Sequence, residues 1–252
     1  MCFNIAIAKT AEQIASFYGI NQTEIPPLPE YYSVSGFSFP DIPVLYRSQS
    51  SPNSSDMRID LMKWGLIPSW IKTERDADGI INKTLNARAE TISRLPSFRG
   101  FWKTRRCVVI TDGFFEPHHI GKQSYPFFIR KKDRGIISLA GLYSLWRGPE
   151  KSREISTFTI ITTEANELMA KIHNRKKRMP VILPDDISSI ERWLDPGLPA
   201  GEIDGFLKKP DELEQLEAFP VSKVIYKREG SNTLLSQHPA HYPELDEGFD
   251  FL

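Results

Sequence analysis

Apolar and polar residues alternate over several stretches of the chain, with the period of a strand that buries one face. Residues 44–46 and Met57–Trp64 show this alternation, and the Ser/Asn/Pro-rich segment 48–56 between them predicts a hairpin tip. Runs rich in β-branched and aromatic residues predict further strands over 106–111, 126–130, 136–142 and 156–163. With a short strand expected at the N-terminus as well, strands dominate the predicted structure.

Helical spacing is confined to short segments. Thr10 and Gln13 fit a capping box that opens a helix through about Tyr18, and the proline-rich stretch 25–29 beyond it is extended. Thr163 can cap a second helix, whose apolar face carries Ala165, Leu168, Met169 and Ile172.

A third helix is predicted near residue 187. Asp185 or Asp186 can cap it, and its apolar side chains would be Ile187, Ile190, Trp193 and Leu194. Few helices beside many strands give the fold class α+β, a strand-dominated domain with peripheral helices.

Composition narrows the class of protein. The 252 residues, 40% of them hydrophobic, suffice for one large domain, which we place at 1–230, followed by an acidic C-terminal tail at 231–252. The chain has no apolar run long enough to cross a membrane and no signal-peptide pattern, so we expect an intracellular protein, cytoplasmic or on the nucleoid when bound to DNA. Two cysteines exclude a disulfide framework, and Cys107 within an apolar run is predicted to be a buried strand residue.

Charge is unevenly distributed although the formal net charge is zero. Residues 88–184 contain 19 Lys and Arg against 8 Asp and Glu, whereas 185–252 contain 6 against 15. A polyanion responds to a local basic face, so a nucleic-acid partner is compatible with this chain. Solvated basic loops are the alternative interpretation.

Cys2 directly follows the initiator Met. Aminopeptidases remove Met1 before small residues, which would leave a free α-amine beside a thiol. An α-amine has an ordinary pKa of about 8, so a useful fraction is neutral at physiological pH. Amine attack on an aldehyde gives an imine, and thiol attack on that imine closes a five-membered thiazolidine. A chance cysteine at this position is the alternative.

Three other segments contain polar side chains that could bind a substrate or transfer protons. Asn86 and Arg88 would share one face of an extended stretch, where Asn86 can hold a polar reaction centre and Arg88 a phosphate; a helix start is the alternative. Glu116 follows a glycine turn among aromatic residues, and partial burial would let it act as a general acid; a surface Glu in a hairpin is the alternative. His173 precedes a basic run and can transfer protons near neutral pH.

The basic run and the aromatic segments are candidate DNA contacts. Arg175 and Lys176 can meet a phosphate backbone, although a solvated loop is the commoner meaning of such a run. Phe37, Pro40 and Trp70 can stack on or wedge between bases, whereas Trp64 is expected in the core.

Together these motifs resemble the SRAP family of abasic-site processing proteins. The resemblance is carried, in order, by Cys2, Trp64-Gly65-Leu66-Ile67-Pro68, Asn86-Ala87-Arg88-Ala89-Glu90-Thr91, Asp112-Gly113-Phe114-Phe115-Glu116 and His173-Asn174-Arg175 through Met179-Pro180. It implies a single β-rich α+β SRAP domain, whose strands form a curved, barrel-like sheet with peripheral helices. As a monomer, this domain would bind single-stranded DNA containing abasic sites and crosslink through the N-terminal cysteine. Cys2 would be the nucleophile, Asn86 the residue that orients the ring, Arg88 a phosphate contact, Glu116 the acid/base and His173 the proton-transfer group. The peptidase label would describe removal of Met1.

Two positions depart from the family pattern, and two other function classes stay open. Phe3-Asn4 stands where Gly and Arg are common, and Pro117-His118 stands where a tryptophan commonly follows the glutamate. His118 and His119 lie beside Glu116, but too few further ligands are visible, so we expect no metal and no other cofactor. The alternatives are an N-terminal-nucleophile amidohydrolase and a DNA-binding module without chemistry.

Overall fold

The computed structural model describes residues 2–48, 57–149, 154–208, 214–227 and 229–246. Strands are the main elements, as predicted. The strands are β1 Asn4–Ile7, β2 Tyr31–Ser35, β3 Asp41–Arg47, β4 Met57–Trp64, β5 Asn86–Arg88, β6 Arg106–Thr111, β7 Gly113–Ile120, β8 Gln123–Lys131, β9 Ile137–Arg147, β10 Glu154–Glu164, β11 Arg178–Pro180 and β12 Leu216–Pro220. The α-helices are α1 Ala11–Tyr18, α2 Glu74–Ile81, α3 Glu167–Ile172, α4 Ile187–Leu194 and α5 Ala200–Leu207, and short 3-10 turns are η1 Gln22–Glu24, η2 Gly36–Ser38, η3 Lys223–Tyr226, η4 Leu234–Gln237 and η5 Pro243–Leu245.

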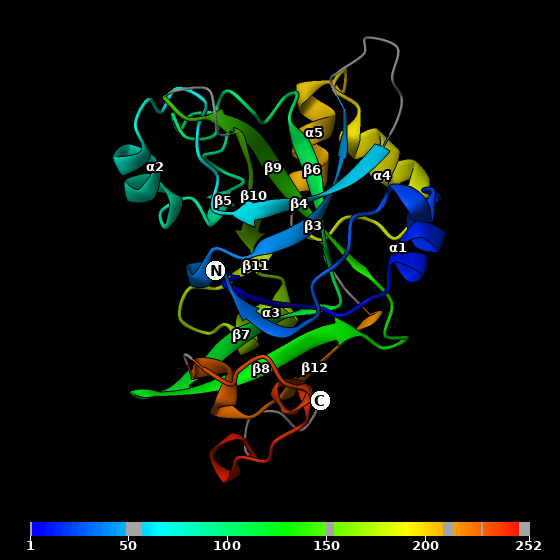
Figure 1. The fold of residues 1–252 in the computed structure, drawn as a ribbon. Helices are drawn as coiled ribbons and strands as arrows, with labels where there is room; N and C mark the ends of the chain where they lie inside the picture. Colours follow the sequence, from blue (N-terminus) through cyan, green and yellow to red (C-terminus); the bar gives the residue numbers. More distant parts are fainter. Residues whose placement is uncertain (1, 49–56, 150–153, 209–213, 228, 247–252) are drawn as a thin grey trace.

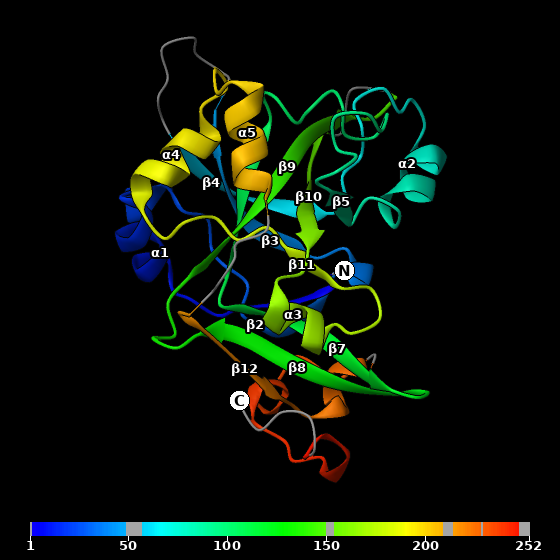
Figure 2. The ribbon, with the colours of Figure 1, turned by 180° about the vertical axis from the view of Figure 1, so that it is seen from behind.

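Two sheets organise the molecule. Strands β10, β4, β3, β6 and β9 follow one another in the larger sheet, and pairing of β9 with β10 closes them into a barrel. The smaller sheet has the order β12-β8-β7-β1-β2. Both ribbon views show β1 between the barrel and the long β7–β8 hairpin (Figures 1 and 2). The α+β, barrel-like expectation is therefore confirmed, and the start of the chain lies where the two sheets meet.

Local sequence signals explain most element boundaries. Thr10 and Gln13 form the predicted reciprocal capping box, and Gly19 ends α1 in the left-handed conformation, where a Cβ is disfavoured. Asp186 caps α4 through the Ser189 amide. Strands β3 and β4 pair antiparallel as expected, while residues 49–56 of their predicted hairpin tip, 48–56, lie outside the described residues.

The cap of α3 corrects one prediction. Thr163 lies within β10, where it pairs with Met179, and the N-cap is Asn166, whose side chain accepts from the Met169 amide. The β-branched run before Thr163 continues as strand because its side chains are buried in the barrel wall, so the helix begins only after it.

The segment that contains Asn232 and η4 packs beside the free edge of β2. Asn232 accepts from the Tyr32 amide (2.7 Å), and Gln237 donates to the Tyr32 carbonyl (2.9 Å). These amides replace the ladder partners that an edge strand lacks. The sequence boundary between domain and tail, near residue 230, stays a prediction.

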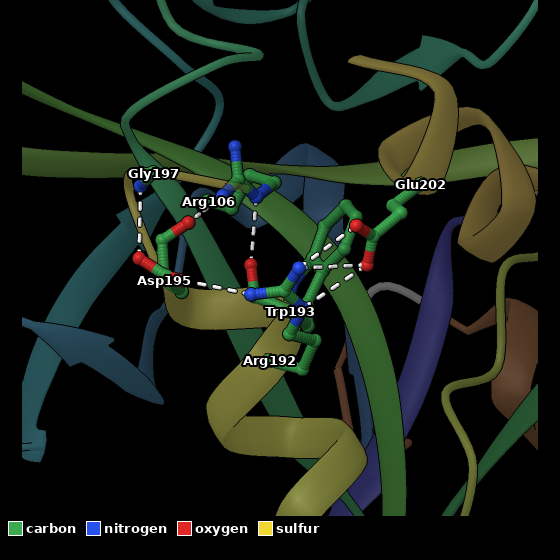
Figure 3. A network of polar contacts seen from close by, with 6 residues as sticks. All are labelled: Arg106, Arg192, Trp193, Asp195, Gly197 and Glu202. Carbon is green, nitrogen blue, oxygen red and sulfur yellow. Dashed lines mark hydrogen bonds and ion pairs between the residues drawn. The ribbon is translucent and has the colours of Figure 1, made fainter. Parts of the chain in front are cut away.

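Arg106 ties the barrel to α4 (Figure 3). Its buried guanidinium donates to the carbonyls of Trp193 (2.7 Å) and Trp102 (3.1 Å) and also contacts the Asp195 and Lys103 carbonyls. These groups are among the carbonyls that the end of a helix or turn leaves without an intrahelical donor. Arg106 therefore satisfies four acceptors at once, one through a buried bond and three through partly buried bonds.

Replacing Arg106 by Met is expected to lower the free energy of unfolding by about 3 kcal/mol, because several carbonyls lose their donor. Urea unfolding measures this loss. Arg192→Met is the matched control, since its ion pair with Glu202 lies at the surface (2.8 Å) and its loss should cost far less. Equal losses in the two variants would contradict the role of Arg106.

Candidate active site around Cys2

Cys2 stands two residues before β1, in the region between the two sheets. Its side chain is fully buried, and its Sγ lies 3.8 Å from the Asn4 carbonyl oxygen. Burial raises the pKa of the thiol well above its ordinary value, and the negative charge of Glu116 raises it further. The thiol is therefore protonated and neutral, and a reaction at sulfur requires a group that accepts the thiol proton.

Asn86 reaches Cys2 from the barrel. Its Nδ2 donates to the Cys2 carbonyl oxygen (2.8 Å), and β5 is held in place by parallel pairing of Asn86 with Ile160 of β10. The Asn86 Oδ1 atom is buried and makes no hydrogen bond within the described residues. Asn86 thus fixes the backbone of the candidate nucleophile and retains one acceptor. Because the segment is a strand, the alternative of a helix start is wrong.

The Trp64-Gly65 pair places the segment that leads to Asn86. Trp64 is buried, as predicted, and its Nε1 donates to the Leu85 carbonyl (2.8 Å). Gly65 has φ +119°, and a Cβ there would lie 2.4 Å from the Ile81 side chain, so only glycine fits. These contacts position the residue immediately before Asn86.

Glu116 lies within β7, the strand that begins at Gly113. Its pairing with Phe127 of β8 continues the strand past Gly113, and its side chain is only 1% exposed, so the alternative of a surface Glu is wrong. Burial raises the pKa of this carboxyl from 4.5 to about 7. Glu116 is therefore partly protonated at neutral pH and can act as a general acid or base.

His173 directly follows α3 and meets Glu116. Its Nδ1 lies 3.0 Å from the Arg178 carbonyl oxygen and 3.2 Å from Glu116 Oε2. A carbonyl only accepts, so we assign the hydrogen to Nδ1, which leaves Nε2 as the basic nitrogen. Burial lowers the pKa of His173 to about 4, so the imidazole is neutral at pH 7. Glu116, and not His173, is the member of the pair that titrates near neutrality.

The other sequence candidates lie at the surface, with one exception. Arg88, Arg175 and Lys176 are exposed, Phe37 and Trp70 are 56% and 51% exposed, and the Phe37 ring packs on Phe3 at 4.8 Å between centroids. Pro40 is the correction: it is buried, so it presents no side-chain surface to a base, and its carbonyl accepts from the Trp64 amide (2.9 Å).

Sequence reasoning missed the structural role of Arg178. This side chain donates to both carboxylate oxygens of Glu90 (2.6 and 3.0 Å) and to the Thr162 carbonyl (2.6 Å), while its own carbonyl holds His173. The sequence offered a signal for this ion pair, because Glu90 lies two residues after Arg88 and Arg178 ends the basic run. In the basic run, Arg175, Lys176 and Lys177 are therefore exposed, whereas Arg178 is buried and has a structural role.

The described residues contain no group of three or more His, Cys, Asp and Glu side chains arranged to hold a metal ion. Cys2 and Cys107 are both buried free thiols, and Cys107 lies on β6 as predicted. None of the described helices is long and apolar enough to cross a membrane.

The closed barrel, the buried Cys2 near the start of the chain and the buried Glu116–His173 pair define the class of this protein: an α+β barrel domain with a cysteine at position 2, whose carbonyl is bonded to Asn86. Residues 1–228 match the family model "SOS response associated peptidase (SRAP)", and the chain belongs to this family.

Named relatives and a solved structure agree with this assignment. The chain is 37% identical over 188 residues to "Abasic site processing protein YoqW" of Bacillus subtilis (strain 168), covering 74% of this chain and 80% of that one. It is 37% identical over 166 residues to "Abasic site processing protein HMCES" of Gallus gallus, covering 58% and 48%. A crystal structure of a protein from Bacteroides thetaiotaomicron superposes with a TM-score of 0.82 at 36% identity, over 95% of this chain and all of that one.

Proposed function

We propose that the chain binds single-stranded DNA and, once Met1 is removed, links Cys2 covalently to abasic sites as a thiazolidine. Such a link would shield the lesion during the DNA damage response. The observation that carries the proposal is the meeting of Cys2 with Asn86 and with the buried Glu116–His173 pair. The names of the relatives supply the substrate class, and Met1 itself lies outside the described residues.

The reaction joins an aldehyde to an aminothiol and releases one water. The ring-opened sugar presents its C1′ aldehyde, the Cys2 amine adds to that carbon, and loss of the carbinolamine hydroxyl as water leaves an imine. The thiol sulfur then adds to the same carbon, and the thiol proton ends on the nitrogen. The closed ring lacks the iminium that promotes β-elimination and strand breakage.

The site residues divide the proton transfers between them. Protonated Glu116 donates to the sugar oxygen during ring opening and to the leaving hydroxyl during dehydration. Neutral His173 accepts a proton at Nε2, while its Nδ1–H stays on the Arg178 carbonyl. Asn86 orients the reacting residue through the Cys2 carbonyl.

Arg88 is proposed to hold a phosphate beside the lesion. It is exposed two residues beyond Asn86 on the same short strand, so its cation can reach a backbone that enters the site. Arg88→Ala is expected to weaken binding to single-stranded DNA and to reduce the slope of log K against log salt by about 0.7. Fluorescence anisotropy over a salt series measures both, and an unchanged slope would remove Arg88 from the interface.

A denaturing gel tests the function. The mature protein is incubated with an abasic single strand, with an intact single strand of the same sequence, and separately with an amide peptide substrate. A heat-stable adduct on the abasic strand alone supports the proposal. Peptide turnover without an adduct would favour an amidohydrolase, and binding without either product would favour a DNA-binding module.

A further inference from the structure

The separation of Glu116 from His173 is set by two elements that are far apart in the sequence. Glu116 lies on β7, whereas His173 follows α3, which has only six residues and ends in a non-helical conformation (φ −88°, ψ 58°). So short a helix has little intrinsic stability of its own. Contacts outside the helix must hold its end against β7.

His118 makes the first of these contacts. Its Nδ1 lies 2.9 Å from the Lys171 carbonyl oxygen and 3.2 Å from that of Ile172. Both carbonyls belong to the last turn of α3, which has no intrahelical donor for them. A carbonyl accepts, so Nδ1 carries the hydrogen and the imidazole of β7 caps the helix that precedes His173.

Asn174 makes the second contact, on the other side of His173. Its Oδ1 accepts from the His119 amide (3.1 Å), and its Nδ2 donates to the His119 carbonyl (2.8 Å). One side-chain amide thus satisfies both backbone groups of a strand residue, as a neighbouring strand would. Arg175 adds a bond to the Gly121 carbonyl at the hairpin turn (2.5 Å).

We propose that His118 and Asn174 are positioning residues that lock the strand carrying Glu116 to the turn carrying His173. Ile172 and Asn174, which flank His173, are hydrogen-bonded to His118 and His119, which follow Glu116 on β7. Glu116 and His173 therefore have little freedom to move relative to each other. This lock stands where the sequence departs from the family pattern at Pro117-His118. The inference rests on the proposed function for its effect on rate.

Loosening the lock would admit water to Glu116. The carboxyl is faced by the N-terminal amine, by Cys2 just before β1, by His173 from the turn after α3, by Lys176 from the basic run and by Tyr226 from η3. Helix α3 packs against β7, and His173 at its end lies against the Glu116 carboxyl, so we infer that this packing helps to exclude water from the carboxyl. Solvation would return the pKa of Glu116 toward its ordinary value and misplace His173.

Two substitutions remove the lock and a third restores it. His118→Phe retains a ring against Phe127, whose centroid lies 6.3 Å away, but lacks the donor. His118→Asn places an amide Nδ2 near the position of the imidazole Nδ1 and restores the donor. Asn174→Ala removes both bonds to His119. Thermal unfolding of each variant establishes that the protein is folded.

Two measurements are made on each variant: the pH titration of the Glu116 carboxyl by 13C NMR without DNA, and the single-turnover rate of adduct formation at saturating protein. We expect His118→Phe and Asn174→Ala to titrate at lower pH and to react about tenfold or more slowly, and His118→Asn to resemble the native protein in both. An unchanged Glu116 titration in the two loss variants, or no recovery in His118→Asn, would overturn the inference. If the native protein forms no adduct while the titrations shift as expected, the proposed function fails and the positioning role stands.

Discussion

Replacing Cys2 by alanine is expected to abolish the heat-stable adduct with an abasic single strand while leaving reversible DNA binding intact. The residual α-amine can still form an imine, but without sulfur the ring cannot close, and the imine hydrolyses. Cys2 is fully buried and its carbonyl is held by Asn86, so removal of one sulfur atom leaves the contacts of its backbone in place. Denaturing electrophoresis measures the adduct, and anisotropy measures binding.

Cys2→Ser is the matched control for this result. Serine preserves the amine and a polar side chain of similar size, but its hydroxyl is a far weaker nucleophile than a thiol at neutral pH. The account predicts no heat-stable product with serine unless borohydride first reduces the imine. A stable unreduced adduct with either variant would assign the linkage to another residue.

Replacing Glu116 by Gln is expected to slow adduct formation by about 10²-fold or more, with little effect on DNA affinity. Glutamine preserves the shape of the buried side chain but cannot deliver a proton to the sugar oxygen or to the leaving hydroxyl. Single-turnover kinetics measures the rate, and anisotropy measures the affinity. Equal losses of rate and affinity would mean that Glu116 serves in binding.

The pH profile distinguishes a proton donor from a structural residue. The pKa of Glu116 is raised to about 7, so the protonated acid is present below that pH and is lost as pH rises through it. The native rate should therefore decline through pH 7, and this limb should disappear in Glu116→Gln. Because the pKa of Glu116 is higher in the folded than in the unfolded protein, the carboxyl adds to the free energy of unfolding at low pH. This stabilisation is lost as pH rises through about 7. Glu116→Gln should consequently gain stability relative to the native protein above pH 7.

The five barrel strands, the first helix cap and the buried Trp64 could be predicted because each depends on a local pattern, whereas β2, β11 and β12 were not predicted. Thr10 and Gln13 satisfy each other within one turn, and β-branched runs favour strand wherever they lie. Helices α2 and α5 escaped prediction because their sequences contain internal glycines, Gly79 and Gly205, which weaken the helical signal. Thr163 was wrongly predicted to be a helix N-cap, because burial in the barrel outweighed the preference of threonine for that position.

Less of the candidate site than of the fold could be predicted from the sequence. Cys2 and Glu116 could be proposed from their chemistry, but the burial that sets the two pKa values depends on β1 meeting β7, more than a hundred residues later. The roles of Arg178 and Asn174 come from contacts across 88 and 55 residues, which no local pattern reveals. Pro40 was wrongly expected to be exposed, because prolines in irregular segments often lie at the surface. Here the tertiary fold buries it.

The most direct test is the intact mass of the native protein after incubation with an abasic oligonucleotide and without reductant. We predict one product whose mass equals the chain lacking Met1 plus the oligonucleotide minus one water, stable to heat. A product that retains Met1, or one that appears only after borohydride reduction, would contradict the claim that the freed amine and thiol of Cys2 close a ring on the sugar.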